Sequence, residues 1–222
     1  MRLFFRTAVL LSVLLLLAAS DSLQAQQQQQ RIRPSLGASV SQTLGVDTKI
    51  TITYSRPGVK GRKIWGELVP YGMAPGNNYS NGKPFPWRAG ANEATTIEFS
   101  KNVLVEGKPL AAGKYSLHMI PGESQWTIIF NRKAQGMGSY DYDPTQDALR
   151  VVVTPVAAPF QEWLVYGFDD LAGVSATAFL HWEKLKVPFK IQTAEPAPTQ
   201  AAPATTAPPA PKPRGSVVNP KP

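Results

Sequence analysis

The sequence predicts an all-β protein: an antiparallel β-sandwich of jelly-roll-like type with one short helix. Many short segments alternate apolar and polar residues with a period of two, which places one face of each strand in a core and the other toward solvent. Segments rich in Gly, Asn and Pro separate them and indicate tight reversals. The chain has no Cys, so disulfides cannot stabilise the fold and core packing must do so.

The alternating segments are the expected strands, in the order 36–44, 50–55, 96–100, 114–119, 126–130, 149–153, 174–183 and 185–191. Tight turns are expected at Glu106-Gly107-Lys108, Ala112-Gly113 and Pro121-Gly122. The short helix is expected over 61–69. The stretch 71–86, rich in Gly, Asn and Pro, is expected to be a loop.

Residues 1–25 have the organisation of a secretory signal peptide. Arg2 and Arg6 give a positive start, and an almost wholly apolar run from Thr7 to Ala19 follows. This run is shorter than the roughly 20 apolar residues of a membrane span. We expect cleavage after Ala25, with Ser20 as the competing position and an uncleaved anchor as the alternative. The mature chain would then be secreted or periplasmic and have no transmembrane segment.

Three further regions follow from composition. Residues 26–34 form a polar, Gln-rich linker, and residues 35–192 form the β-sandwich domain, which is long enough for one core of ordinary size. Residues 193–222 are rich in Pro and Ala and contain no aromatic residue. Because such a segment buries too little apolar area to offset its ordering entropy, we expect a disordered tail.

The formal net charge is +8, but Lys and Arg are scattered singly and form no basic run. This pattern is typical of a solubilising surface, and we expect no nucleic-acid partner.

Motifs for metal binding are incomplete. The only histidines are His118 and His181; His181 and Glu183 would share one strand face, but too few ligands accompany them for a zinc site. A calcium-like spacing occurs at Asp141, Asp143, Thr145 and Asp147, but it lacks the Gly at the sixth position and the final Glu, so an Asp-rich hairpin loop is the better interpretation.

Motifs for catalysis or phosphate binding are absent or incomplete as well. The sequence contains no G-x-S-x-G elbow. The segment 107–114 has the wrong Gly spacing for a phosphate loop and fits a hairpin better. We therefore expect neither a metal nor a cofactor.

One polar and aromatic cluster lies between Tyr54 and Glu93. It contains four cations and three aromatic residues besides acceptor groups: Arg56, Lys60, Arg62, Arg88, Trp65, Tyr71, Trp87, Asn92 and Glu93. Planar guanidinium groups beside aromatic faces suit recognition of a carboxylate, a phosphate or a sugar. The same residues could instead cap the open end of the sandwich through ion pairs. The candidate ligand-binding residues are Lys60, Arg62, Tyr71, Trp87, Arg88, Asn92 and Glu93.

These motifs carry a family resemblance. The runs Ser55-Arg56-Pro57 through Lys60-Gly61-Arg62, Leu-Val-Pro-Tyr-Gly at 68–72, and Trp87-Arg88 through Thr95 resemble the bacterial DUF2911 family. So do the segments 112–117 and 126–131, and the resemblance covers about 35–191. It implies an exported protein and supplies no established activity. Members often pass almost directly from Tyr-Gly to Trp-Arg, so residues 73–86 are an insertion that could cover or block a site.

Two functional hypotheses follow. The first is a non-catalytic module that binds an anionic or carbohydrate small ligand or a component of the cell envelope. The alternative is a hydrolase or lyase acting on an envelope polysaccharide, with Glu93 as general acid or base and Arg62 and Arg88 holding an anionic group. Most glycosidases use two carboxylates, and Asp169 or Asp170 would have to supply the second.

Overall fold

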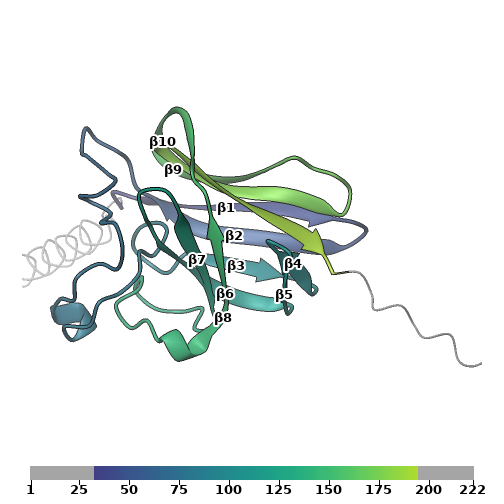
Figure 1. Cartoon of the computed structure of the whole chain (residues 1–222), viewed down its shortest axis with the longest axis horizontal. Coiled ribbons are helices and arrows are strands. Elements are labelled where there is room, and N and C mark those ends of the chain that lie inside the picture. The colour runs from purple at the N-terminus through teal and green to yellow at the C-terminus, as the bar shows by residue number, and fades with distance from the viewer. Residues whose placement is uncertain (1–32, 195–222) are drawn as a thin grey trace, which may run out of the picture.

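Ten strands form two antiparallel sheets in the computed structural model, which describes residues 33–194 (Figure 1). The larger sheet has the order β1-β2-β3-β6-β7-β8 and the smaller the order β5-β4-β10-β9. The strands are β1 (Leu36–Leu44), β2 (Thr48–Arg56), β3 (Thr96–Phe99), β4 (Val103–Val105), β5 (Lys108–Leu110), β6 (Gly113–Ile120), β7 (Trp126–Asn131), β8 (Asp147–Val153), β9 (Val156–Asp169) and β10 (Ser175–Thr193). The predicted antiparallel sandwich is confirmed.

Most strands pair with a sequence neighbour, so hairpins dominate the connections. The β4–β5 hairpin lies between β3 and β6 in sequence but belongs to the other sheet. Its turn uses Glu106 and Gly107, whose φ angles are 48° and 74°. Two successive positive φ angles are characteristic of a type I′ turn, which matches the twist of the flanking strands. The predicted turn at this position is confirmed.

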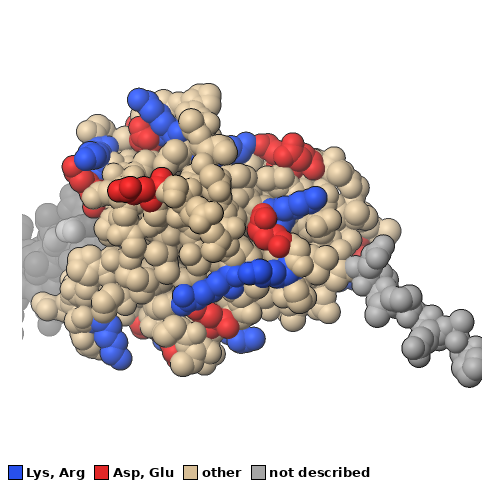
Figure 2. Space-filling model, in the orientation of Figure 1, with Lys and Arg blue, Asp and Glu red and all other residues tan. Residues whose placement is uncertain are grey.

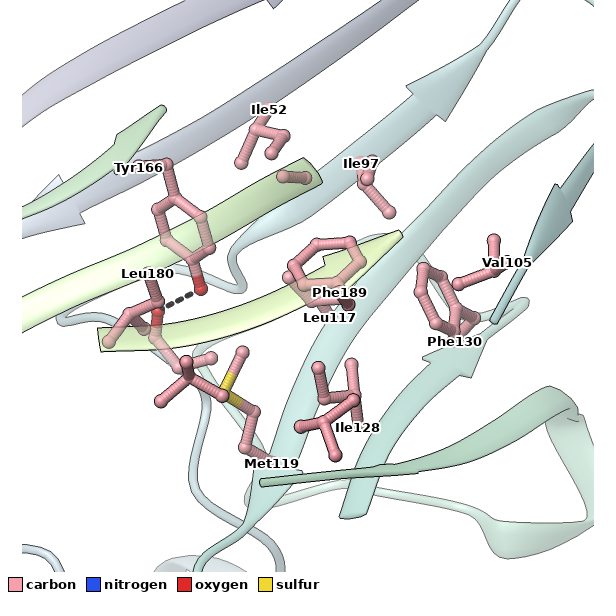
Figure 3. Packing of buried hydrophobic residues seen from close by; sticks show 14 of the residues in the cluster. Ile52, Ile97, Val105, Leu117, Met119, Ile128, Phe130, Tyr166, Leu180 and Phe189 are labelled. Atoms are coloured by element: carbon pink, nitrogen blue, oxygen red, sulfur yellow. Dashed lines mark hydrogen bonds between the residues drawn. The ribbon is translucent and has the colours of Figure 1, made fainter. Parts of the chain in front are cut away.

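The core lies between the sheets and is built from the alternating apolar positions (Figure 3). On β2, Ile50, Ile52 and Tyr54 are buried, as the period of two predicts. Side chains of the larger sheet meet those of the smaller, for example Phe130 of β7 and Phe189 of β10, whose ring centroids lie 6.2 Å apart. The central strand β6 is buried along its whole middle, from Tyr115 to Met119.

The two strands expected at 174–183 and 185–191 are one continuous strand, β10. Along it the buried apolar positions are even up to Trp182 and odd from Val187 onward. The change occurs around Glu183, which has a φ of 55°, and the pairing with β9 shifts register on both sides of it. An irregularity of this kind reverses which side chains face the core.

The helix expected over 61–69 is not present; that prediction is wrong. Lys60 and Gly61 have φ angles of 49° and 66° and form a tight turn, in which the Arg62 N–H donates to the Val59 carbonyl at 3.0 Å. Gly66 has a φ of 82°. Left-handed residues at this spacing interrupt a helix. The short 3₁₀ helices of the described part are η1 (Asn78–Ser80), within the expected loop, and η2 (Pro144–Gln146).

Strands β4, β5 and β9 were not predicted from the sequence. The first two have three residues each, too few to display an alternation. The first half of β9 has no buried residue, and Leu164 is the first side chain of the strand to enter the core. A strand without a buried face gives no signal of period two.

The signal peptide, most of the Gln-rich linker and nearly all of the Pro/Ala-rich tail lie outside the described residues. Between residues 33 and 194, no helix has the length and apolar character that crossing a membrane requires.

Cationic and anionic side chains are interspersed on the face shown in Figure 2, and no region of that face carries one sign alone.

Replacing Ile97 with Ala should lower the free energy of unfolding by about 2–5 kcal/mol, because Ile97 of β3 is fully buried and its loss leaves a cavity. Urea unfolding followed by circular dichroism measures the change. The matched control is Val46→Ala in the β1–β2 turn, where the side chain is 96% exposed and the effect should stay within about 0.5 kcal/mol. Equal effects of the two substitutions would contradict the described core.

Candidate functional site

Two long connections build a cavity at one end of the sandwich. The first runs from β2 to β3 over residues 57–95, and the second joins β7 to β8 over 132–146. They contact each other through Tyr140, whose ring centroid lies 5.3 Å from that of Tyr79 and 5.2 Å from that of Phe85. Both connections lie in the left half of Figure 1, and the first runs from the upper left to the lower left.

The cavity has a volume of about 470 Å³ and is partly open to solvent. This volume lies within the range of small-molecule sites. Its wall contains three cations, Lys60, Arg62 and Arg88, and four aromatic residues, Phe85, Trp87, Tyr140 and Trp182. No Asp or Glu lies in the wall. Four of the predicted residues therefore converge on one cavity, namely Lys60, Arg62, Trp87 and Arg88.

Arg88 is held in a defined position. Its Nη1 donates to the Asn92 carbonyl at 2.5 Å, and its guanidinium carbon lies 4.7 Å from the centre of the Tyr140 ring. A Cβ atom at Gly138 would come within 2.1 Å of that carbon, so the absence of a side chain at Gly138 leaves the space that the guanidinium occupies. The planar group thus stacks on an aromatic face without an acidic partner.

Lys60 and Arg62 lie on the tight turn after β2. The Arg62 side chain donates to the Val59 carbonyl at 3.1 Å and to the Gly58 carbonyl at 2.6 Å, so it pins the turn as well as lining the cavity. The Lys60 Nζ lies 5.7 Å from the Trp163 ring centre. None of the ion pairs found within residues 33–194 involves Lys60, Arg62 or Arg88.

The aromatic wall is backed by further tryptophans. Trp87 and Trp182 stack with an interplanar angle of 16° and a centroid distance of 6.1 Å. Trp65 packs edge-on against both and against Trp126, at 4.9 to 5.8 Å. The Trp65 indole N–H is buried and has no hydrogen-bond partner among the described residues. Trp65 lies behind the wall and not in it.

The segment between Trp87 and Asn92 adopts an unusual backbone. Ala89 is fully buried with a φ of 51°, and Asn92 has a φ of 59°. For a residue with a Cβ such a conformation costs on the order of 1–3 kcal/mol. The Ala89 carbonyl accepts from the Tyr166 hydroxyl at 2.8 Å and from the Thr95 hydroxyl at 3.2 Å, and these buried bonds hold the turn.

Three predicted site residues lie outside the cavity wall: Tyr71, Asn92 and Glu93. The Tyr71 ring covers Gly66 and is 44% exposed. The Asn92 side chain donates to the Ser35 carbonyl at 3.0 Å, which fixes the chain just before β1. Arg56, the fourth cation of the sequence cluster, is also absent from the wall and donates to the Leu164 carbonyl at 2.9 Å.

Glu93 forms an ion pair with Arg33 at 2.6 Å and accepts from the Ser55 hydroxyl at 3.4 Å. A hydrogen bond from its own backbone N–H and the bond from Arg33 lower its pKa. A lowered carboxyl pKa disfavours the role of general acid, which needs a proton at the working pH, and leaves the role of general base open. Asp169 pairs with Lys186 and Asp170 is exposed, and neither lies in the wall. The two-carboxylate arrangement of the hydrolase alternative is not assembled here.

The inserted segment 73–86 forms part of the wall. Ala74 and Phe85 pair across the base of this segment through backbone hydrogen bonds of 2.8 and 3.1 Å, and both line the cavity. Asn77 caps η1 with its side-chain oxygen, which fixes the tip of the segment.

His118 belongs to a buried network that the sequence did not suggest. Its Nδ1 lies 2.7 Å from the Ser139 hydroxyl and its Nε2 lies 2.9 Å from the Ser116 hydroxyl. Burial lowers the pKa of His118 to about 4, and the nearby Arg88 adds to the lowering, against the effects of Asp147 and Asp141. The imidazole is therefore neutral at neutral pH and joins β6 to the connection that carries Tyr140.

The residues considered in the sequence as possible metal ligands make local structural contacts. His181 lies 2.8 Å from the Pro159 carbonyl, and Glu183 accepts from the Lys184 backbone N–H. The Asp-rich segment is the β7–β8 connection, as predicted: Asp143 caps η2 and Asp147 pairs with Arg150. No group of three potential metal-ligating side chains gathers anywhere between residues 33 and 194.

Comparison with known proteins gave one match. The sequence profile of the family described as "Protein of unknown function (DUF2911)" matches residues 35–191, which is nearly the whole described region. No curated protein and no solved structure matches the chain.

The buried His118 should make stability fall in acid. Because its folded-state pKa is about 4 and that of an unfolded His is about 6.5, the unfolded chain binds the extra proton first. The protein is expected to lose up to about 3 kcal/mol from this group as the pH falls from 7 to 4. Urea unfolding of the wild type and of His118→Gln across this range measures it. The stability difference between the two proteins should shrink or reverse toward pH 4; a difference independent of pH would contradict the assignment.

Proposed function

This chain belongs to the DUF2911 family, and from that starting point we propose that it is an exported, non-catalytic binding protein that holds a small anionic ligand in the cavity between its loops. Export is supported by the signal-peptide organisation of residues 1–25. The ligand class is supported by the wall of the cavity.

The single observation that carries the proposal is the charge of that wall. Lys60, Arg62 and Arg88 contribute three cations, and no Asp or Glu lines the cavity to balance them. A neighbouring carboxylate, that of Glu162, accepts from the Lys60 backbone N–H at 3.0 Å and is in none of the ion pairs found within residues 33–194. Cations without ion-pair partners attract an anion, and a charge-assisted hydrogen bond to a carboxylate or phosphate is about twice as strong as a neutral one. A guanidinium already oriented by Tyr140 loses little entropy on binding.

The aromatic residues of the wall indicate which chemical group accompanies the anionic group of the ligand. Trp87, Trp182, Phe85 and Tyr140 provide apolar surface next to the cations. Sites of this size commonly combine apolar and aromatic walls with a few polar groups that fix orientation. The wall therefore suits a carboxylate or phosphate attached to a ring, either aromatic or saccharide.

The wall also supports binding without catalysis. It contains no carboxylate and no histidine, since Glu93 lies outside it and His118 is buried and absent from it; Lys60 and Tyr140 are its titratable groups besides the arginines. No observation favours the hydrolase or lyase alternative, which would rest on Glu93.

Lys60→Asn should weaken ligand binding by about tenfold, because it removes one cation that no acidic side chain of residues 33–194 pairs with. Asn tolerates the left-handed backbone at this position, so the turn should persist. Binding of glucuronate, glucose 6-phosphate and 4-hydroxybenzoate is measured by tryptophan fluorescence, to which Trp87 and Trp182 should respond.

The matched control is Lys63→Asn, the same exchange three residues away, where Lys63 pairs with Glu67 outside the wall. It should bind as the wild type does. The proposal is wrong if the wild type shows saturable binding to none of these anions. It is also wrong if Lys60→Asn binds them as tightly as the wild type does.

Glu93→Gln distinguishes the two functional hypotheses. Because Glu93 lies outside the wall, the variant should bind the same anions as tightly as the wild type and lose only the contact with Arg33. Fluorescence titration measures binding, and reducing-end assays on acidic polysaccharides measure turnover. Turnover by the pure wild-type protein that disappears in Glu93→Gln would establish the hydrolase or lyase instead.

A further inference from the structure

A second cavity borders the first. It has a volume of about 810 Å³ and lies between the inserted segment 73–86 and the β7–β8 connection. Phe85 and Tyr140 line both cavities, so one pair of aromatic rings forms the boundary between them. The rings meet edge to face, with centroids 5.2 Å apart and an interplanar angle of 76°.

The two cavities differ in chemistry. All charged groups in the wall of the first are cations, whereas the second combines Lys83 and Arg150 with Asp141 and Asp143. Asn81 and Lys83 also line the second cavity, and neither side chain makes a hydrogen bond within the described residues. This wall offers both hydrogen-bond donors and hydrogen-bond acceptors. It therefore suits a ligand with hydroxyl groups, because a hydroxyl group can both donate and accept.

The backbone of the walls disfavours a peptide. Extended peptides are commonly bound by adding a strand to a sheet edge, which requires backbone N–H groups in the site. Prolines, which have none, recur in both walls: Pro34, Pro57 and Pro70 in the first, Pro84 and Pro144 in the second. Prolines at these positions favour recognition by side chains and ring faces over the addition of a strand.

We propose that the two cavities are consecutive subsites for one acidic oligosaccharide. A sugar unit bearing a carboxylate lies in the cationic cavity, the chain crosses the edge formed by Phe85 and Tyr140, and further units place their hydroxyl groups against Asn81, Lys83 and the carboxylates of the second cavity. This inference rests on the proposed function and extends it from a small anion to a chain.

The test is isothermal titration calorimetry with galacturonate and its linear dimer and tetramer. For the wild type the tetramer should bind at least about tenfold more tightly than the monomer, because it contacts both subsites. The double variant Asn81→Gly, Lys83→Ala should lose this gain and still bind the monomer; Gly accommodates the positive φ of residue 81. Lys63→Ala, outside both cavities, should behave as the wild type.

Five outcomes overturn the inference. If the tetramer binds no more tightly than the monomer, the second subsite is wrong and the anion-binding cavity stands. A gain that survives the double variant places the additional units elsewhere. Equal binding of neutral cellotetraose rejects an acidic ligand, and a larger gain with tetraglutamate than with the tetramer identifies a peptide. If no anion of any length binds, the proposed function fails and this inference fails with it.

Discussion

The geometry of the cavity end of the sandwich depends on one buried acceptor, the carbonyl oxygen of Ala89. Tyr166 of β9 and Thr95 at the start of β3 both donate to it, and Tyr166 is in turn positioned by its backbone N–H, which donates to the Tyr54 hydroxyl of β2 at 3.1 Å. The two sheets are thereby connected through a single strained residue. Arg88 directly precedes Ala89 and Trp87 comes one residue earlier, so the same bonds that join the sheets also orient an aromatic face and a cation toward the cavity.

This arrangement explains how a site can collect cations without acidic partners. The backbone carbonyls of Gly58, Val59 and Asn92 accept from Arg62 and Arg88 and orient them, but they leave the net charge intact. A carboxylate in the same place would have oriented these groups and also cancelled their attraction for an anion. Orientation by neutral acceptors and by the Tyr140 face keeps the field of the cavity positive.

The fold was predictable for strands longer than three residues in which one face is buried along most of the length. Alternation located the strands of the larger sheet and most of β10, and it failed for β9, whose first half has no buried residue, and for the turns at 61–69, where left-handed residues replace the expected helix. At the site, Lys60, Arg62, Trp87 and Arg88 were predictable because they lie close together in sequence. Tyr140 and Trp182 were not, because only the folded chain brings them there, and no local pattern separates Glu93 from its neighbours that line the wall.

The change of facing within β10 has a consequence for how this sequence can evolve. Trp182 points to the cavity end and Val187 to the opposite part of the core, and the residues between them reverse the parity of the strand. The strand advances by five positions from Trp182 to Val187, so a regular strand would place these two side chains on opposite faces. A substitution that abolishes the irregularity at Glu183 would therefore turn Val187, Phe189 and Ile191 outward together, whereas the additional loss of one residue from the interval would bring them back into phase with Trp182. The irregularity at Glu183 and the length of this interval must therefore change together if both halves of β10 are to keep facing the core.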